Sequence, residues 1–103
     1  MRVTTLLIFA SLASFVGSAA AQPAPPEVFE AKYCSGCHAV DKKMVGPSMK
    51  DVAKKYRDQK DAATYLAEKI KKGGTGVWGS VPMPPADVTE AEIKSLVEWI
   101  VKL

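Results

Sequence analysis

Histidine and cysteine are scarce in this chain of 103 residues, which has one histidine and two cysteines. A structural zinc site made by the chain alone would therefore lack its fourth Cys or His ligand. Aromatic residues make up 8% of the sequence and do not interleave with a basic cluster, which disfavours a nucleic-acid surface. No internal repeat is present, and no segment shows convincing strand-like alternation, so we expect no sheet.

The three scarce residues stand together in the motif Cys34-Ser35-Gly36-Cys37-His38. Two thiols three positions apart, followed directly by an imidazole, have the spacing used to attach haem c. Each cysteine can form a thioether with one haem vinyl group, and the histidine then lies under the ring, where it can bind iron. Ser35 and Gly36 are small, so the backbone between the thiols can pass close to the porphyrin edge. The motif predicts one covalently attached haem c.

A redox dithiol and a structural disulfide also use a pair of cysteines, but both fit this motif less well. A thioredoxin-like dithiol would need a strand before it and a helix after it, in a βαβ unit. A structural disulfide is possible in an exported protein, but it would close a very short loop and leave His38 unexplained. A disulfide-bearing binding module without haem therefore remains a weaker alternative.

The size and charge of the chain are those of one small domain. A domain this short buries a limited core, and a covalent cofactor would add apolar mass to it. The formal charge is +3, and its distribution is uneven. Residues 41–72 carry ten Lys or Arg against five Asp or Glu, while residues 73–103 carry two against four. Such asymmetry can orient a protein as it meets a charged partner, although solvated helix faces explain it equally well.

The N-terminal segment has the features of a cleaved secretory signal peptide over residues 1–21. Arg2 gives a positive start, an apolar run follows, and Ala19-Ala20-Ala21 offers small side chains before Gln22. The run is nearly long enough for an uncleaved anchor, but Ser, Thr and Gly interrupt it. Because no twin-arginine pair is present, we expect export to the periplasm by the general secretory route. The mature domain would cover residues 22–103, without stable membrane insertion.

The mature chain is predicted to be all-α, with four to five short helices. A proline-rich lead-in precedes a first helix over residues 27–33, which we expect to continue through residues 34–38. Capping signals open the helices that follow, and a glycine pair closes one of them. The expected segments are residues 48 to 56 or 57, opened by Ser48 with Asp51; residues 61–72, closed by Gly73-Gly74; and a helix opened by the capping box Thr89–Glu92, which then runs to the C-terminus.

Between the last two helices, residues 74–88 form a loop rich in glycine and proline. We expect composition, rather than a ladder of hydrogen bonds, to fix its backbone. Met83 stands between two prolines in this loop, where its thioether could be the second axial ligand of the iron. Met83 could also simply fill a gap in an apolar wall. Met44 and Met49 are rival ligands, but both lie close to His38 in sequence, so the opposite face of the haem is hard for them to reach.

These features together resemble the small bacterial class I cytochromes c of the cytochrome c-551 (c8) type. The resemblance covers essentially the whole mature chain. The matching stretches are the attachment motif, Lys43-Met-Val-Gly-Pro47, Lys50-Asp-Val-Ala53, Gly76-Val-Trp-Gly79, Pro82-Met-Pro-Pro85 and the last helix with Trp99. The resemblance implies a small fold wrapped around one haem, in which Phe29 and Trp99 meet where the first and last helices cross.

The resemblance also implies further site residues. Pro47 would accept a hydrogen bond from the second ring nitrogen of His38, and Trp78 would donate its indole N–H to a haem propionate. Lys69 occupies a place where relatives have a basic residue near a propionate. Ala86 departs from several relatives, which have asparagine there, so a side-chain hydrogen bond near the methionine sulfur would be missing.

The predicted function is one-electron transport rather than enzymatic catalysis. With His38 and Met83 as axial ligands of the iron, no coordination position is left for a substrate. The main alternative is a haem enzyme or gas sensor with an open sixth position, but no distal His or Arg is evident. We expect a monomer that docks transiently on redox partners. By resemblance, these are a membrane-bound cytochrome donor and a terminal oxidase or nitrite reductase.

Overall fold

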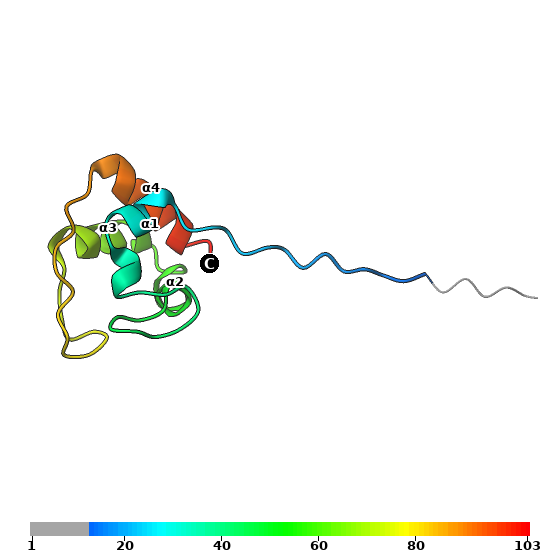
Figure 1. Cartoon of the computed structure of the whole chain (residues 1–103), viewed down its shortest axis with the longest axis horizontal. Helices are drawn as coiled ribbons and strands as arrows, with labels where there is room; N and C mark the ends of the chain where they lie inside the picture. The colour runs from blue at the N-terminus through cyan, green and yellow to red at the C-terminus, as the bar shows by residue number, and fades with distance from the viewer. Residues whose placement is uncertain (1–12) are drawn as a thin grey trace, which may run out of the picture.

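The structure is a computed structural model that describes residues 13–103. The positive start and most of the apolar run of the predicted signal peptide lie outside the described residues. Residues 13–26 form an extended segment without secondary structure, which leads into the helical domain (Figure 1). Within residues 13–103, no helix is long and apolar enough to cross a membrane.

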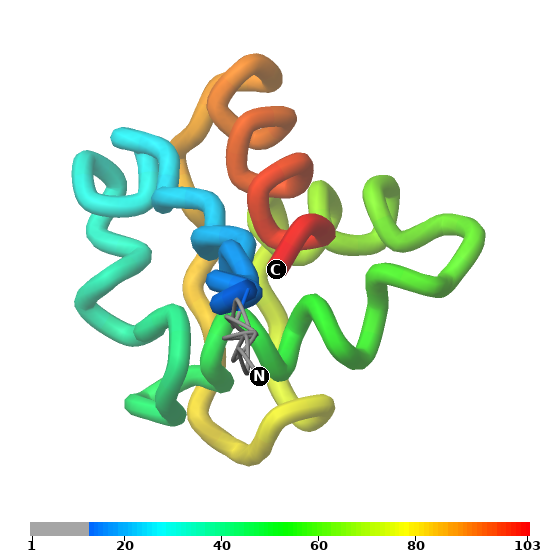
Figure 2. Tube along the Cα trace, turned by 90° about the vertical axis from the view of Figure 1, so that its right-hand side faces the viewer, coloured from blue at the N-terminus to red at the C-terminus, as the bar shows by residue number. Residues whose placement is uncertain are grey.

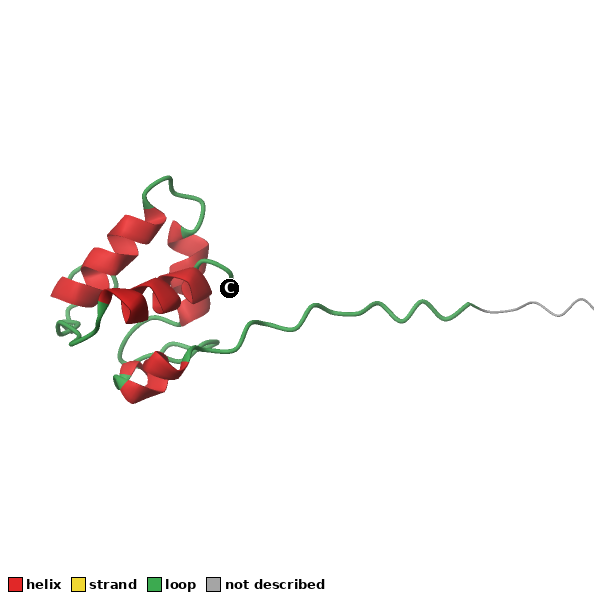
Figure 3. Ribbon diagram, turned by 90° about the horizontal axis from the view of Figure 1, so that it is seen from above, coloured by secondary structure: helices red, strands yellow, loops and turns green. Residues whose placement is uncertain are grey.

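The domain is all-α, which confirms the predicted fold class. Its elements are α1 (Glu27–Ala31), a short 3₁₀ helix (Cys34–Gly36), α2 (Met49–Tyr56), α3 (Ala62–Lys72) and α4 (Glu90–Ile100). Figure 3 shows that helices joined by loops make up the part of the chain that the structure describes, and none of it is drawn as a strand.

The first helix is shorter than predicted, and it does not continue through the attachment motif. It ends at Ala31, and Tyr33 adopts a left-handed backbone with φ 61° and ψ 22°. A left-handed residue cannot continue a right-handed helix, so the chain turns there and re-enters as the 3₁₀ helix. Tyr33 itself is 84% exposed. The predicted continuous helix was therefore wrong, because this turn is not visible in the local sequence.

The capping signals of the other helices are confirmed. The backbone N–H of Asp51 donates to Ser48 Oγ at 3.1 Å, at the start of α2. At the start of α4, the N–H of Thr89 donates to Glu92 Oε2 at 2.8 Å, and the N–H of Glu92 donates to Thr89 Oγ1 at 3.2 Å. Gly73 ends α3 with φ 68°, a conformation that glycine adopts without steric cost.

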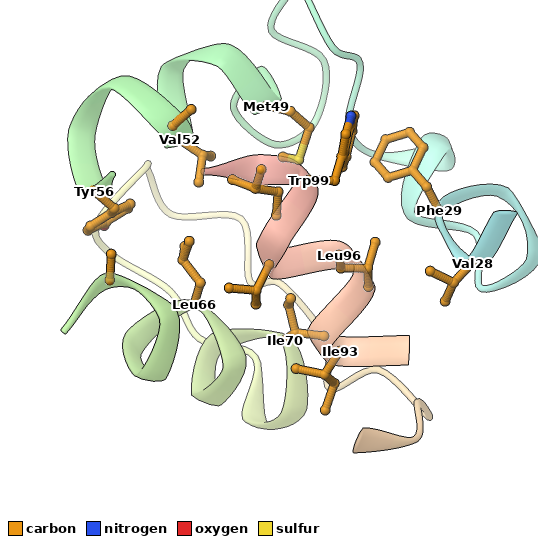
Figure 4. Packing of buried hydrophobic residues seen from close by; sticks show 14 residues of the cluster. Val28, Phe29, Met49, Val52, Tyr56, Leu66, Ile70, Ile93, Leu96 and Trp99 are labelled. Atoms are coloured by element: carbon orange, nitrogen blue, oxygen red, sulfur yellow. The ribbon is translucent and has the colours of Figure 1, made fainter. Parts of the chain in front are cut away.

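Helix α4 lies at the centre of the core, in contact with α1, α2 and α3. Figures 2 and 4 show α4 between the other helices, with Leu66 and Ile70 of α3 lying beside it. The buried apolar cluster consists of Val28, Phe29, Met49, Val52, Ala53, Tyr56, Ala62, Leu66, Ile70, Ile93, Leu96, Val97, Trp99 and Ile100.

The predicted crossing of the first and last helices is confirmed. The rings of Phe29 and Trp99 meet edge to face, with centroids 5.0 Å apart. The indole N–H of Trp99 donates to the carbonyl of Pro23 at 3.0 Å. This bond ties the segment before α1 to the last helix, and it places the start of the domain beside its C-terminus (Figure 2).

Candidate functional site

One cavity of about 390 Å³ brings the predicted site residues together. It lies between the attachment motif, the turn before α2, the inner faces of α2 and α3, and the loop of residues 74–84. All seven residues singled out from the sequence line it: Cys34, Cys37, His38, Pro47, Lys69, Trp78 and Met83. Residues far apart in the chain, such as His38 and Trp78, therefore border the same space.

The two thiols flank the edge of this cavity on a short turn. The N–H groups of Cys37 and His38 both donate to the carbonyl of Cys34, at 3.2 Å and 2.9 Å. The sulfurs are not joined in a disulfide. Burial raises the pKa of the Cys34 thiol, a backbone hydrogen bond opposes this rise, and the Glu30 carboxylate adds to it. Cys34 is partly buried and Cys37 is exposed, and both border the cavity.

The imidazole of His38 is held in a defined orientation. Its Nδ1 lies 2.8 Å from the carbonyl oxygen of Pro47. A carbonyl can only accept a hydrogen bond, so Nδ1 carries the proton and the lone pair of the neutral ring is on Nε2. Gly46 packs so closely against the ring that a Cβ at this position would collide with it. The Gly46 N–H also donates to the Cys37 carbonyl at 2.8 Å, which links this turn to the attachment motif.

Met83 is held by one isolated pair of backbone hydrogen bonds, which is not a ladder and which the composition of the loop did not predict. Its N–H donates to the Gly74 carbonyl at 2.8 Å, and the Gly74 N–H donates back to the Met83 carbonyl at 3.0 Å. Gly73 is also required here, because a Cβ on it would collide with the Met83 carbonyl. The Ala86 N–H donates to the Ile70 carbonyl at 3.0 Å, which ties the far end of the loop to α3.

The rival methionines differ from Met83 in position. Met44 lies on the surface, 41% exposed, and does not line the cavity. Met49 does line it, but this residue begins α2 and is 6% exposed within the apolar core. Met83 is 36% exposed, and it borders the cavity although it lies far from His38 in the sequence.

A pair of tyrosines forms part of the cavity wall, and neither was predicted from the sequence as part of the site. The rings of Tyr56 in α2 and Tyr65 in α3 lie 4.7 Å apart, and their hydroxyls are 3.4 Å apart. Burial, with the neighbouring Tyr65 hydroxyl, raises the pKa of Tyr56 to about 12. Tyr56 is thus a neutral phenol at physiological pH. The sequence signal that could have identified Tyr56 is its helical spacing from Met49, Val52 and Ala53, which places it at the end of the apolar stripe of α2.

The residues of this cavity fit a flat apolar macrocycle that carries carboxylates at one edge. Partly exposed apolar side chains gather around it, namely those of Val45, Val77, Trp78, Val81 and Met83. Among the described residues, no Asp or Glu lines the cavity, whereas Lys43 and Lys69 do. The amine of Lys69 lies 5.5 Å from the centre of the Tyr65 ring. Apolar walls with cations and no anions suit haem and its propionates.

Comparisons with known proteins agree with this fit. The cytochrome c family model matches residues 26–103. The chain is 53% identical over 92 residues to cytochrome c-552 of Hydrogenobacter thermophilus, covering 89% of this chain and 94% of that protein. It is 46% identical over 104 residues to cytochrome c-552 of Nitrosomonas europaea, covering 100% and 99%. The crystal structure of wild-type Nitrosomonas europaea cytochrome c552 matches with a TM-score of 0.71 at 51% identity, covering 75% of this chain and 96% of that one.

Proposed function

We propose that this chain, which belongs to the cytochrome c family and within it to the c-551/c-552 type, carries electrons by holding one haem iron between His38 and Met83. The chain is an electron carrier with one covalently bound haem c, and it is not an enzyme. The observation that carries this proposal is that both thiols, the imidazole and the thioether border one cavity.

Each residue of the attachment turn has a distinct role in this proposal. Cys34 and Cys37 hold the cofactor through thioethers, and His38 binds the iron through Nε2. The Pro47 carbonyl accepts the Nδ1–H bond at 2.8 Å, which fixes the ring and raises its basicity as a ligand. Gly46 leaves room for the ring to lie flat against the turn. Haem c, when bound, supplies an iron that takes up and releases one electron.

The loop of residues 74–84 supplies the second side of the site. Met83 would bind the iron through its sulfur, held in place by its paired hydrogen bonds with Gly74. A thioether ligand opposite an imidazole favours the reduced iron and raises the reduction potential. The side chain of Ala86 has no group that could bond to this sulfur. Trp78 and Lys69 would face the propionates, the former by its indole N–H and the latter by its charge.

This ligand set explains why the protein would transfer electrons rather than transform a substrate. With a protein side chain on each side of the iron, no coordination position is open. The same ligands serve both oxidation states, so little rearrangement accompanies each transfer. The apolar side chains of Val77 and Val81 at the cavity limit the access of water. A haem enzyme or gas sensor would instead need an open position.

The proposed location is the periplasm, reached by the general secretory route with cleavage after Ala21. A mature chain that begins at Gln22 retains Pro23 and its bond to Trp99. Its proposed partners are a membrane-bound cytochrome donor and a terminal oxidase or nitrite reductase, which would dock transiently on the monomer. Lys43, at the cavity, would favour acidic partner surfaces.

Substitution of the methionines tests the ligand assignment. The full chain is produced in a host that attaches haem c, and Met83→Ala is compared with Met44→Ala as a matched control. We expect Met83→Ala to abolish the weak near-infrared band of the sulfur–iron bond in the oxidised protein. The reduced variant should also bind carbon monoxide rapidly. Met44→Ala should change neither property, because Met44 lies outside the cavity.

The result that would contradict this assignment is a Met83→Ala protein that keeps the near-infrared band and excludes carbon monoxide. Rapid carbon monoxide binding by the unmodified reduced protein would favour the enzyme or sensor. A Met49→Ala variant that alone loses the band would transfer the role to Met49, which also borders the cavity.

A further inference from the structure

Lys55 lies against the aromatic wall of the cavity, which Trp78 and Tyr56 form here. It is the penultimate residue of α2, and its amine lies 4.9 Å from the centre of the Trp78 ring. The same amine lies 5.7 Å from the centre of the Tyr56 ring. Within residues 13–103, no carboxylate pairs with Lys55. The electron-rich faces of these rings are therefore its charge-stabilising neighbours.

The side chain of Trp78 contacts two residues of α2. The residue lies in a loop outside any helix, and its side chain is 40% exposed. Its ring meets Tyr56 edge to face, with centroids 6.4 Å apart, and Lys55 lies over one face. A cation over an indole is attracted by the electron-rich ring face, which favours one ring orientation over another.

The aromatic wall of the cavity, formed by Trp78, Tyr56 and Tyr65, has a positively charged lysine at each end. From Lys55 it runs through Trp78 and the tyrosine pair to Lys69, whose amine lies over Tyr65. Lys69 lines the cavity and Lys55 does not, and no described Asp or Glu lines it. A cofactor that turns its carboxylates toward this wall would therefore have one lysine near each end of the wall. The resemblance to relatives pointed to Lys69 alone.

We propose that Lys55 is a positioning residue, which holds the Trp78 indole against the haem and raises the reduction potential by its charge. This inference rests on the proposed function, because it requires a haem in the cavity. The oxidised iron carries one more positive charge than the reduced iron, so a nearby cation stabilises the reduced form. Removal of the cation should therefore lower the reduction potential.

The neighbouring residue Lys54 provides a matched control. It lies in the same helix, is exposed, and contacts no aromatic ring or carboxylate in the described part of the chain. Lys55→Met and Lys54→Met each remove one positive charge and keep an unbranched apolar stem. Both variants are made in the full chain as haem-loaded protein. Lys55→Arg keeps the charge and the capacity for stacking on the ring.

We expect Lys55→Met to lower the ratio of reduced to oxidised protein at a fixed ambient potential by roughly two- to tenfold. Lys54→Met should change this ratio by less than about a third as much, since Lys55, and not Lys54, lies over the two rings of the cavity wall. The indole N–H resonance of Trp78 should move in Lys55→Met, while that of Trp99, bonded to Pro23, serves as the internal reference. Lys55→Arg should keep both the ratio and the resonance.

Equal shifts of potential in the two methionine variants would overturn the inference, because only net charge would then matter. An unmoved Trp78 resonance in Lys55→Met would also overturn it. Either result, obtained on a protein whose unmodified form shows Met83 ligation, leaves the proposed function intact. A colourless unmodified protein would overturn both proposals together.

Discussion

Two regions of this small domain are held together in different ways. Where α1 crosses α4, buried apolar side chains contact one another directly, as Phe29 and Trp99 do. Around the cavity, glycines, backbone hydrogen bonds and partly exposed apolar residues dominate, as at Gly46, Gly74 and Met83. The contact of Phe29 with Trp99 is made by the chain's own side chains, although Phe29 also borders the cavity, whereas the cavity itself is shaped for a group that the chain does not encode. Substitutions in the first region should therefore change stability, and those in the second should change the cofactor.

The largest effect is expected where α1 crosses α4, and there a substitution should lower the stability of the protein without changing its absorption spectrum. Trp99→Ala removes a ring that packs on Phe29 and a bond to Pro23, so the free energy of unfolding should fall by about 3–5 kcal/mol. The folded fraction should keep the near-infrared band of the parent, because Trp99 does not line the cavity. Denaturant titration and absorption spectra check the two parts. A stable Trp99→Ala protein with an altered band would erase the distinction between the regions.

The second test introduces one methyl group beside the proposed iron ligand. Gly46→Ala would place a Cβ against the His38 ring, and we expect a cost of about 1–3 kcal/mol with a shifted ferric spectrum. Ser95→Thr is the control, because it also adds one methyl group, but at an exposed position of α4 outside the cavity. Spectra and denaturant titrations of both variants are compared. If the two behave alike, Gly46 does not set the orientation of the imidazole.

A smaller effect is expected at the start of α4. Thr89→Ala removes the hydroxyl that accepts the Glu92 N–H at 3.2 Å, which should cost about 1 kcal/mol. The reduction potential should not change, because this cap lies outside the cavity. Thr75→Ala makes the same change in the cavity loop, and it is the matched substitution for the cavity region. A potential that responds to Thr89→Ala would show that the regions are coupled.

The smallest effect is expected at the junction of the two regions. Tyr33 holds φ 61° between α1 and the attachment motif, a conformation that costs a tyrosine free energy and a glycine very little. Tyr33→Gly should therefore stabilise the haem-loaded protein by about 0.5–1 kcal/mol, measured by thermal unfolding. Tyr33→Ala should bring no such gain, since alanine meets the same restriction. Destabilisation by glycine would mean that the exposed ring makes stabilising contacts.

The extent of prediction from sequence differs between these regions for a physical reason. Helix caps such as Ser48 and Thr89 are local, since the interacting atoms lie three residues apart and the spacing is visible in the sequence. The apolar stripe of α4 likewise determines which face is buried. The turn at Tyr33 was missed because its left-handed backbone is adopted by an exposed tyrosine rather than by a glycine or asparagine, the residues that mark such a turn in a sequence.

The candidate site was predictable where chemistry restricts the residue type. Residues that supply a thiol, an imidazole or a thioether are few in this chain, and all of the predicted site residues border one cavity. What could not be predicted depends on pairs brought together by folding. The bond between Gly74 and Met83, the contact of Tyr56 with Tyr65, and the position of Lys55 over Trp78 are of this kind.

The spin state of the oxidised iron tests the central claim most directly. We would purify the haem-loaded protein at neutral pH and record its ferric absorption and electron paramagnetic resonance spectra. Strong ligands on both sides, His38 and Met83, predict a red protein whose ferric iron is low-spin. A colourless preparation, or a purely high-spin ferric spectrum, would contradict the account.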